Sequence, residues 1–157
     1  MAGRGKAPRQ GEILAEAVIQ VGEDLGLEIH EQFEVGRRIW GAKRSIDVLL
    51  IHKETRKALG IECKFQSEPG SVEEKIPATI KDIEAWPIPG LVVFAGDGFS
   101  ENMKAFLIST GKAIEFEALE PWLCLFFGLP VNQRKHPRVR IVLPAKRPGP
   151  SDLPLNL

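Results

Sequence analysis

Two acidic residues interrupt two apolar, strand-like segments, and this pattern constrains the chain more than any other feature of the sequence. Asp47 lies within the apolar run 44–51, and Glu62 lies within the run 60–66. A carboxylate buried in a hydrophobic strand is costly unless it pairs with a cation or binds a metal. Because Lys64 follows two residues after Glu62, these three side chains indicate a functional site.

The segment between the two acids predicts how they come together. Residues 52–58 are polar and charged, as in a hairpin connection. Side chains alternate between the two faces of a strand, so Glu62, Lys64 and Gln66 share one face. Antiparallel pairing would bring Asp47 and Glu62 together near the open end of the hairpin. Two close carboxylates repel each other unless a divalent cation neutralises them, and oxygen ligands suit Mg²⁺ or Mn²⁺.

An acid followed by Glu62-Cys63-Lys64 on a β-hairpin resembles the PD-(D/E)XK nuclease superfamily. The resemblance implies that Asp47, Glu62 and the backbone carbonyl of Cys63 bind the metal, while Lys64 orients or activates the attacking water. The reaction implied is phosphodiester hydrolysis assisted by a metal acting as a Lewis acid. Ile46 stands where the family name has proline. The plainer interpretation is an edge hairpin that carries an exposed Glu-Lys pair.

The remaining elements agree with such a nuclease core. Hydrophobic periodicity predicts helices and strands around the hairpin at the following residues: a helix over 11–25, a strand over 28–40, a helix over 72–86, a buried strand over 91–95, a helix over 100–111 and a last strand over 113–119. We therefore expect an α/β fold with a mixed sheet, ordered α-β-β-β-α-β with an additional C-terminal helix and strand.

Further site residues are expected around the hairpin. Gln66 could hydrogen-bond the scissile phosphate as a catalytic residue, or face solvent at the strand end. The resemblance also implies a glutamate from the first helix, for which Glu16 is the candidate metal ligand and Glu12 the second choice. Helical geometry places Glu16 off the apolar stripe, so a solvated position is an equal alternative.

Basic residues near the proposed site predict contacts with the DNA backbone. They are Arg37, Arg38, Lys43, Arg44 and, on the helix after the hairpin, Lys75. The two ends of the chain are also basic, although the net charge is zero. Neutralising phosphates releases counterions and adds salt-sensitive affinity. Basic, proline-rich tails are equally often just disordered.

Composition predicts one compact domain. The chain has 157 residues, of which 43% are apolar, enough for a substantial core. We divide it into a basic N-terminal arm (1–10), the nuclease core (11–132) and a basic, proline-rich C-terminal tail (133–157). With neither a run of eighteen apolar residues nor a signal peptide, the sequence predicts a soluble, intracellular and cytoplasmic protein without a membrane partner.

Several other classes of site are disfavoured. Two cysteines are too few for a disulfide scaffold or a structural zinc site, and the three histidines lack ligand spacing. Phosphate-binding glycine loops are also missing, so we expect no organic cofactor.

The preferred hypothesis is a Mg²⁺-dependent DNA endonuclease. The alternatives are a catalytically inactive, nuclease-like module that binds DNA or a partner, and an unrelated α/β protein. Among nucleases, a Holliday-junction resolvase and a small restriction, homing or phage endonuclease are not distinguished. Cutting both strands calls for a homodimer, and the apolar run 122–127 and the tryptophans Trp40, Trp86 and Trp122, expected to be exposed, could form its interface or the core.

Overall fold

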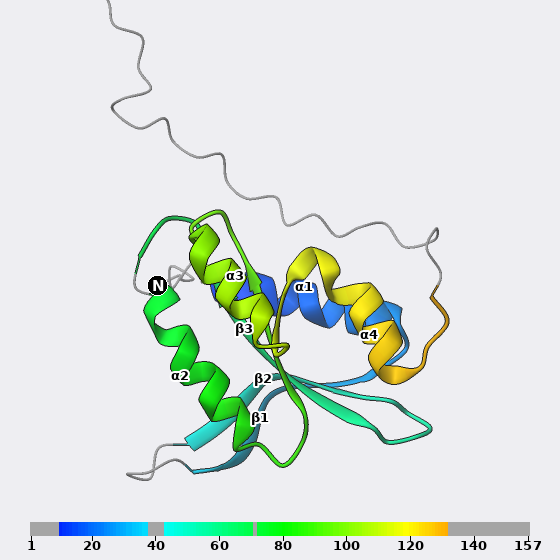
Figure 1. Ribbon diagram of the computed structural model, residues 1–157. Helices are drawn as coiled ribbons and strands as arrows, with labels where there is room; N and C mark the ends of the chain where they lie inside the picture. Colours follow the sequence, from blue (N-terminus) through cyan, green and yellow to red (C-terminus); the bar gives the residue numbers. More distant parts are fainter. Residues whose placement is uncertain (1–9, 38–42, 71, 132–157) are drawn as a thin grey trace, which may run out of the picture.

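The computed structural model describes residues 10–37, 43–70 and 72–131 (Figure 1). The elements follow in this order: α1 (Gln10–Asp24), β1 (Glu28–Arg37), β2 (Lys43–Ile51), β3 (Ala58–Phe65), α2 (Val72–Glu84), β4 (Gly90–Ala95), α3 (Glu101–Ser109), β5 (Ala113–Glu115), the 3-10 turn η2 (Phe116–Ala118) and α4 (Leu119–Phe127). This is an α/β fold with a five-stranded mixed sheet, and the predicted order of the core elements is confirmed.

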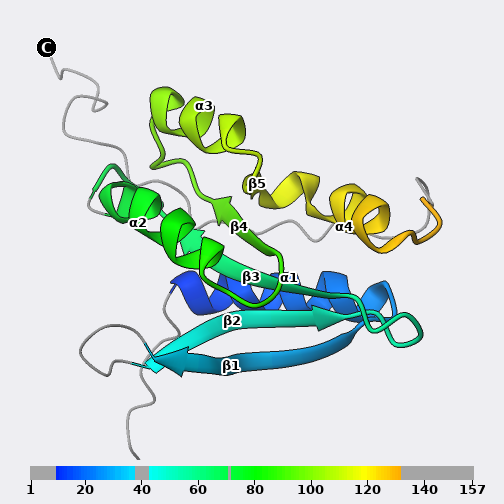
Figure 2. The ribbon, with the colours of Figure 1, turned by 60° about the horizontal axis from the view of Figure 1, so that its bottom comes forward.

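The strands lie side by side in sequence order, from β1 to β5. Neighbours are antiparallel from β1 to β3 and parallel from β3 to β5. Parallel neighbours need a crossover connection, and α2 provides it between β3 and β4. Figure 2 shows β1, β2 and β3 together, with the turn between β2 and β3 at the right of the view.

Helices cover both faces of the sheet and make two hydrophobic clusters. The first cluster joins α1 and α4 to one face, where Ile61, Cys63 and Phe65 of β3 are buried. The second joins α2 and α3 to the other face, where Val92 and Phe94 of β4 are buried. The odd-numbered residues of β3 therefore point to α1, as the alternation predicted, and its even-numbered residues point to α2.

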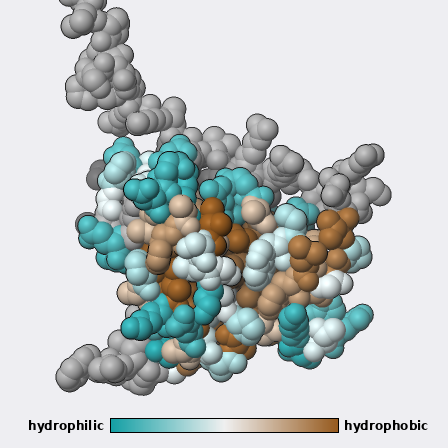
Figure 3. All heavy atoms as spheres, viewed as in Figure 1, coloured by the Kyte–Doolittle hydropathy of each residue, from teal (hydrophilic) through white to brown (hydrophobic). Residues whose placement is uncertain are grey.

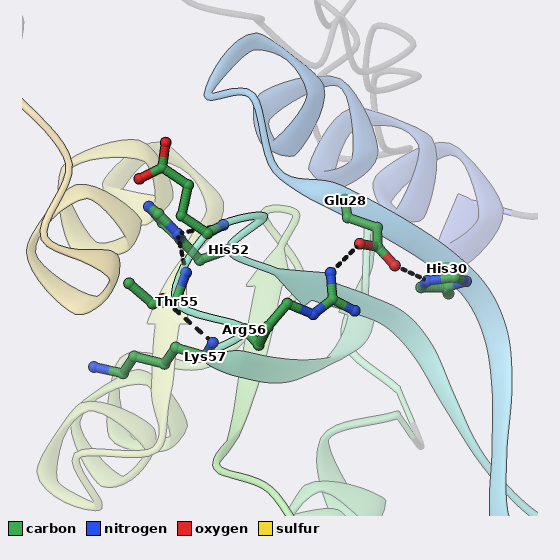
Figure 4. Close-up of polar contacts among 7 residues, drawn as sticks. Glu28, His30, His52, Thr55, Arg56 and Lys57 are labelled. Carbon is green, nitrogen blue, oxygen red and sulfur yellow. Dashed lines mark hydrogen bonds and ion pairs between the residues drawn. The ribbon is translucent and has the colours of Figure 1, made fainter.

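A network of polar contacts closes the predicted hairpin at its turn (Figure 4). His52 Nδ1 accepts hydrogen bonds from the backbone N–H groups of Glu54 and Thr55, at 3.3 and 3.1 Å. Arg56 adopts a left-handed backbone conformation, with φ of 62°, and its guanidinium pairs with Glu28 at the start of β1. The turn thus fixes the closed end of the β2–β3 pair and ties it to β1.

The C-terminal part of the core differs from the sequence-based expectation. The last strand was expected over 113–119, but β5 is short and continues into the 3-10 turn. The run after it forms α4, which ends at Gly128 in the left-handed conformation, with φ of 66°. In α4, Leu123 and Phe127 enter the first cluster, so this run is largely core.

Two of the tryptophans that we expected to be exposed lie in the described residues. Trp86 is buried, with 7% of its surface exposed, because its ring packs on Gly60 and Gly90. Trp122 is half-buried in α4 and stacks on Phe126, with ring centroids 5.2 Å apart. The expectation of exposure is therefore wrong for Trp86. Trp40 lies outside the described residues.

Apolar side chains are exposed over α3 and α4, on the face that Figure 3 shows. Among the exposed apolar residues of these two helices are Phe106, Ile108 and Leu125, the last of which is 78% exposed. Within the described ranges, every helix falls short of the length and apolar character that a membrane span needs. Almost all of the predicted arm and the whole of the predicted tail lie outside the described residues, so those domain limits stay predictions.

Candidate active site

Asp47 lies where β2 and β3 separate. The antiparallel pairs between these strands run from Ile51–Ala58 to Val48–Ile61 and stop there. Beyond the last pair, Asp47 Oδ2 accepts a hydrogen bond from the backbone N–H of Cys63 at 2.9 Å. The carboxylate therefore occupies the place that a strand carbonyl would take, next to the Glu62-Cys63-Lys64 segment.

Glu62 and Lys64 line a pocket between β3 and α2. Lys64 Nζ lies 3.6 Å from Glu62 Oε1, and the two side chains are only 24% and 16% exposed. The pocket has a volume of about 350 Å³, and its other walls are residues of α2 and the turn that follows: Lys75, Ala78, Thr79, Asp82, Ile83 and Trp86. A carboxylate and an ammonium group thus face a cavity large enough for part of a nucleotide.

The α2 wall of this pocket is polar at helical spacing. Lys75, Thr79 and Asp82 are separated by four and three residues, which places them on one face of the helix. Asp82 Oδ1 lies 3.2 Å from Arg44 Nε of β2, and both side chains are 20% exposed. That contact is too poorly aligned to be a hydrogen bond, so it is an electrostatic pair. It joins α2 to β2 three residues before Asp47.

Both carboxylates act electrostatically on one group. Burial raises the pKa of the Cys63 thiol well above its usual value, and the negative charges of Asp47 and Glu62 raise it further, while Lys64 opposes them. The thiol itself points into the first hydrophobic cluster. Cys63 and Cys124 are both free and buried. The two acids therefore concentrate negative charge around the backbone of Cys63.

The donors at this point suit a hard divalent cation. In a strand, the N–H and C=O of one residue point toward the same neighbour, so the Cys63 carbonyl shares the gap with Asp47. Two carboxylates and a carbonyl match Mg²⁺, which retains several waters. In the described part of the chain, no group of three or more acidic, histidine or cysteine side chains could hold a metal ion alone. The proposed ligand set combines the two carboxylates with this backbone carbonyl.

Gln66 lies one residue beyond β3 and is 4% exposed. The side-chain Nε2 of Gln66 donates a hydrogen bond to the backbone carbonyl of Gly98 at 2.7 Å. The backbone carbonyl of Gln66 accepts one from the backbone N–H of Gly98 at 2.9 Å. Gly96 and Gly98 have no room for a Cβ against this segment. Gln66 therefore ties the end of β3 to the loop after β4 and is not part of the pocket wall. Its catalytic role stays a prediction.

The helix-one candidate lies apart from the pocket. Glu16 is exposed on α1, and α1 covers the face of the sheet opposite to Glu62 and Lys64. Glu12 is exposed on the first turn of the same helix. The structure does not bring Glu16 together with the pocket residues, so its assignment as a metal ligand stays a prediction.

The predicted DNA-binding residues fall into three groups. Lys75 lines the pocket and Arg44 borders it through Asp82. Lys43 is 67% exposed and lies 3.5 Å from Glu34 across β1 and β2. The side chain of Arg37 and the whole of Arg38 lie outside the described residues.

Sequence reasoning missed two contributors to the site. One is the rest of the α2 face, Thr79 and Asp82, for which the helical spacing from the predicted Lys75 was an available signal. The other is Gln32 of β1, whose Nε2 donates to Asp47 Oδ1 at 3.4 Å. Nothing in the local sequence of β1 marks Gln32, because the contact depends on the register between β1 and β2.

Comparison with known proteins identifies the family. No curated protein matches the chain significantly. A solved structure is similar, the crystal structure of a protein of unknown function, AF1548, with a TM-score of 0.46 and 20% identity over 69% of this chain. This chain covers 60% of that protein's length. A family model for the PD-(D/E)XK nuclease superfamily domain matches residues 6–120. The chain belongs to the PD-(D/E)XK nuclease superfamily.

Proposed function

We propose that this protein is a Mg²⁺-dependent DNA endonuclease, with Mn²⁺ as an alternative ion, whose site is built from Asp47, Glu62 and Lys64. The hydrogen bond from Cys63 N to Asp47 Oδ2 carries this proposal, because it holds the first acid against the segment that contains the second acid and the lysine. Membership of a nuclease superfamily supports it.

The metal would be held by Asp47, Glu62 and the carbonyl of Cys63. When bound, a divalent ion polarises a phosphate oxygen and acidifies a water molecule. The donors are all oxygen, as Mg²⁺ and Mn²⁺ prefer. One oxygen of Asp47 already accepts from Cys63 N, which holds the carboxylate against the backbone between Glu62 and Lys64.

Lys64 provides the positive charge inside the pocket. Its ammonium group lies near Glu62, and the side chain as a whole is 24% exposed, so water screens its charge only in part. From there it can hold the attacking water by hydrogen bonding and stabilise the extra negative charge on the phosphate. Lys75 is exposed on the α2 wall and can contact a neighbouring phosphate.

The substrate that this geometry favours is DNA, reached from the open end of the hairpin. A single site per chain cuts one strand, so cleavage of both strands requires a homodimer, which we include in the proposal. A Holliday-junction resolvase and a small restriction, homing or phage endonuclease both fit a site of this kind.

Cleavage of a substrate panel tests the proposal. Supercoiled, linear duplex, single-stranded and four-way-junction DNA are incubated with Mg²⁺, Mn²⁺ or EDTA, with wild type, Glu62→Gln and Lys64→Ala. Two exposed residues outside the pocket give matched controls, Glu117→Gln and Lys53→Ala. We expect metal-dependent cleavage by wild type and both controls, with a loss of about 100-fold or more in each site variant.

Two results contradict the proposal. The first is DNA binding without cleavage of any substrate, which favours the catalytically inactive alternative. The second is cleavage that survives in Glu62→Gln, which shows that another site in the preparation or the chain is responsible.

A further inference from the structure

Gln32 lies opposite Asp47 on the neighbouring strand. The pairs Glu31–Val48 and Phe33–Ile46 flank this position, so the two side chains are direct neighbours across β1 and β2. Gln32 Nε2 donates to Asp47 Oδ1 at 3.4 Å, at the long end of the range for hydrogen bonds. The other oxygen of Asp47 is held by Cys63 N. Each carboxylate oxygen thus has one N–H donor, from a different strand.

The backbone is irregular at this pair in both strands. Gln32 has a φ of 47°, in the left-handed region that few residues other than glycine adopt. In β2, Ile46 packs in the cluster with α2, whereas Val48 packs in the cluster with α1. Residues two apart face the same side in a regular strand, so β2 changes face at Asp47. Such irregular positions gather at functional sites.

We propose that Gln32 is a positioning residue for Asp47, a role that rests on the proposed nuclease function. With Cys63 N on one oxygen and the Gln32 amide on the other, rotation of the Asp47 carboxylate is restricted. The carboxylate is then held in one orientation, in which its remaining lone pairs can bind a metal ion. Gln32 is exposed, so its contribution is to the orientation of Asp47 and little to the hydrophobic core.

Two substitutions separate the amide from the backbone conformation. Gln32→Gly removes the amide but adopts a positive φ without a steric cost. Gln32→Ala removes the amide and keeps that cost. Gln20→Ala is the control, because Gln20 is an exposed glutamine on α1, which covers the face of the sheet opposite to Glu62 and Lys64. Glu62→Gln serves as the reference for loss of the metal site.

The readouts are Mn²⁺ binding by calorimetry on the full chain without DNA, and the melting temperature. We expect the Kd for Mn²⁺ to rise about tenfold in both Gln32 variants, as for other side chains that orient a metal ligand. The control keeps the wild-type Kd, and Gln32→Gly keeps or exceeds the wild-type melting temperature. A loss of affinity in a variant of full stability is not explained by a structural role.

Three outcomes overturn the proposal. If Gln32→Gly binds Mn²⁺ like wild type while Glu62→Gln does not bind, the positioning role is wrong and the proposed function stands. If Gln32→Ala loses affinity for Mn²⁺ and Gln32→Gly keeps it, the backbone conformation at residue 32 positions Asp47 and the side-chain amide does not. If wild type does not bind Mn²⁺, the metal site of the proposed function fails together with the role of Gln32.

Discussion

Asp47 Oδ2 and the backbone N–H of Cys63 form a 2.9 Å hydrogen bond at the point where β2 and β3 stop pairing. This hydrogen bond has two effects. It gives an acceptor to the N–H of Cys63 beyond the last residue pair of β2 and β3, and it holds a carboxylate against the backbone between Glu62 and Lys64. The structural and the proposed chemical roles of Asp47 can therefore be separated by substitution.

Asp47→Asn and Asp47→Ala are expected to differ in stability. The amide oxygen of asparagine still accepts from Cys63 N, whereas alanine leaves that N–H without an acceptor, at a cost of about 1–3 kcal/mol. Chemical denaturation measures the difference, and hydrogen exchange of the Cys63 amide locates it. Equal stability and equal amide protection in the two variants would show that this hydrogen bond does not stabilise the end of the β2–β3 pairing.

Gly60 is expected to tolerate no side chain. An added Cβ would lie 2.6 Å from Trp86 Cζ3 and 3.2 Å from Ile46 Cγ2. Gly60→Ala should lower the free energy of unfolding by about 1–3 kcal/mol, because overpacking displaces the ring that closes the pocket. Gly11→Ala is the control, since nothing lies within 4 Å of its added Cβ. Full stability in Gly60→Ala would contradict the packing of Trp86 described here.

The Arg44–Asp82 pair is expected to couple β2 to α2. Both side chains are 20% exposed, so solvent screens the pair only in part. A double-mutant cycle with Arg44→Ala and Asp82→Ala, followed by urea denaturation, should give a coupling energy of about 1 kcal/mol, smaller at high salt. Additive losses would mean that the pair does not hold α2 against β2. They would also leave Arg44 available for DNA.

Acid stability is expected to depend on Glu28. Hydrogen bonds from Arg56 and then His30 lower the pKa of Glu28 from its usual 4.5 to about 2. A carboxylate whose pKa is lower in the folded state stabilises the fold above its unfolded pKa and loses this effect as the pH falls. The melting temperature of wild type should therefore drop between pH 4.5 and 2 more than that of Glu28→Gln.

Glu54→Gln is the matched control for this experiment, because it removes an exposed carboxylate from the turn that carries Arg56. It should follow the wild-type curve through the acid range. Parallel curves for wild type and Glu28→Gln would show that the contacts of Glu28 with Arg56 and His30 do not persist in solution.

The sequence was sufficient for the hairpin and for the faces of β3. Alternation of polar and apolar residues predicted that Ile61, Cys63 and Phe65 are buried against one helix layer while Glu62 and Lys64 face the other way, and the structure confirms it. The helix α4 was not predicted, because residues 122–127 form a short continuous apolar run, and periodicity alone does not tell a helix from a buried strand in such a run. Gly128 was the available signal for its end.

The contacts of Gln32 and Gln66 could not be predicted from the sequence. Gln66 follows Glu62 and Lys64 at the spacing of two residues that places strand side chains on one face. However, β3 ends before Gln66, and the loop after β4 approaches closely, so that the side-chain amide of Gln66 binds Gly98. Gln32 reaches Asp47 through strand register and a left-handed backbone. Both depend on contacts between segments that are distant in sequence, which local patterns do not encode.

The most direct test of the account is the single-turnover rate of DNA cleavage in Mg²⁺ for Asp47→Asn, Glu62→Gln and the double variant. Residues that act as one unit give non-additive losses. Because both acids are proposed to hold the same ion, each single variant should lose about 100-fold or more, and the double variant should be no slower than the slower single one. Wild-type rates in either single variant, or losses that multiply in the double variant, would contradict a shared metal site.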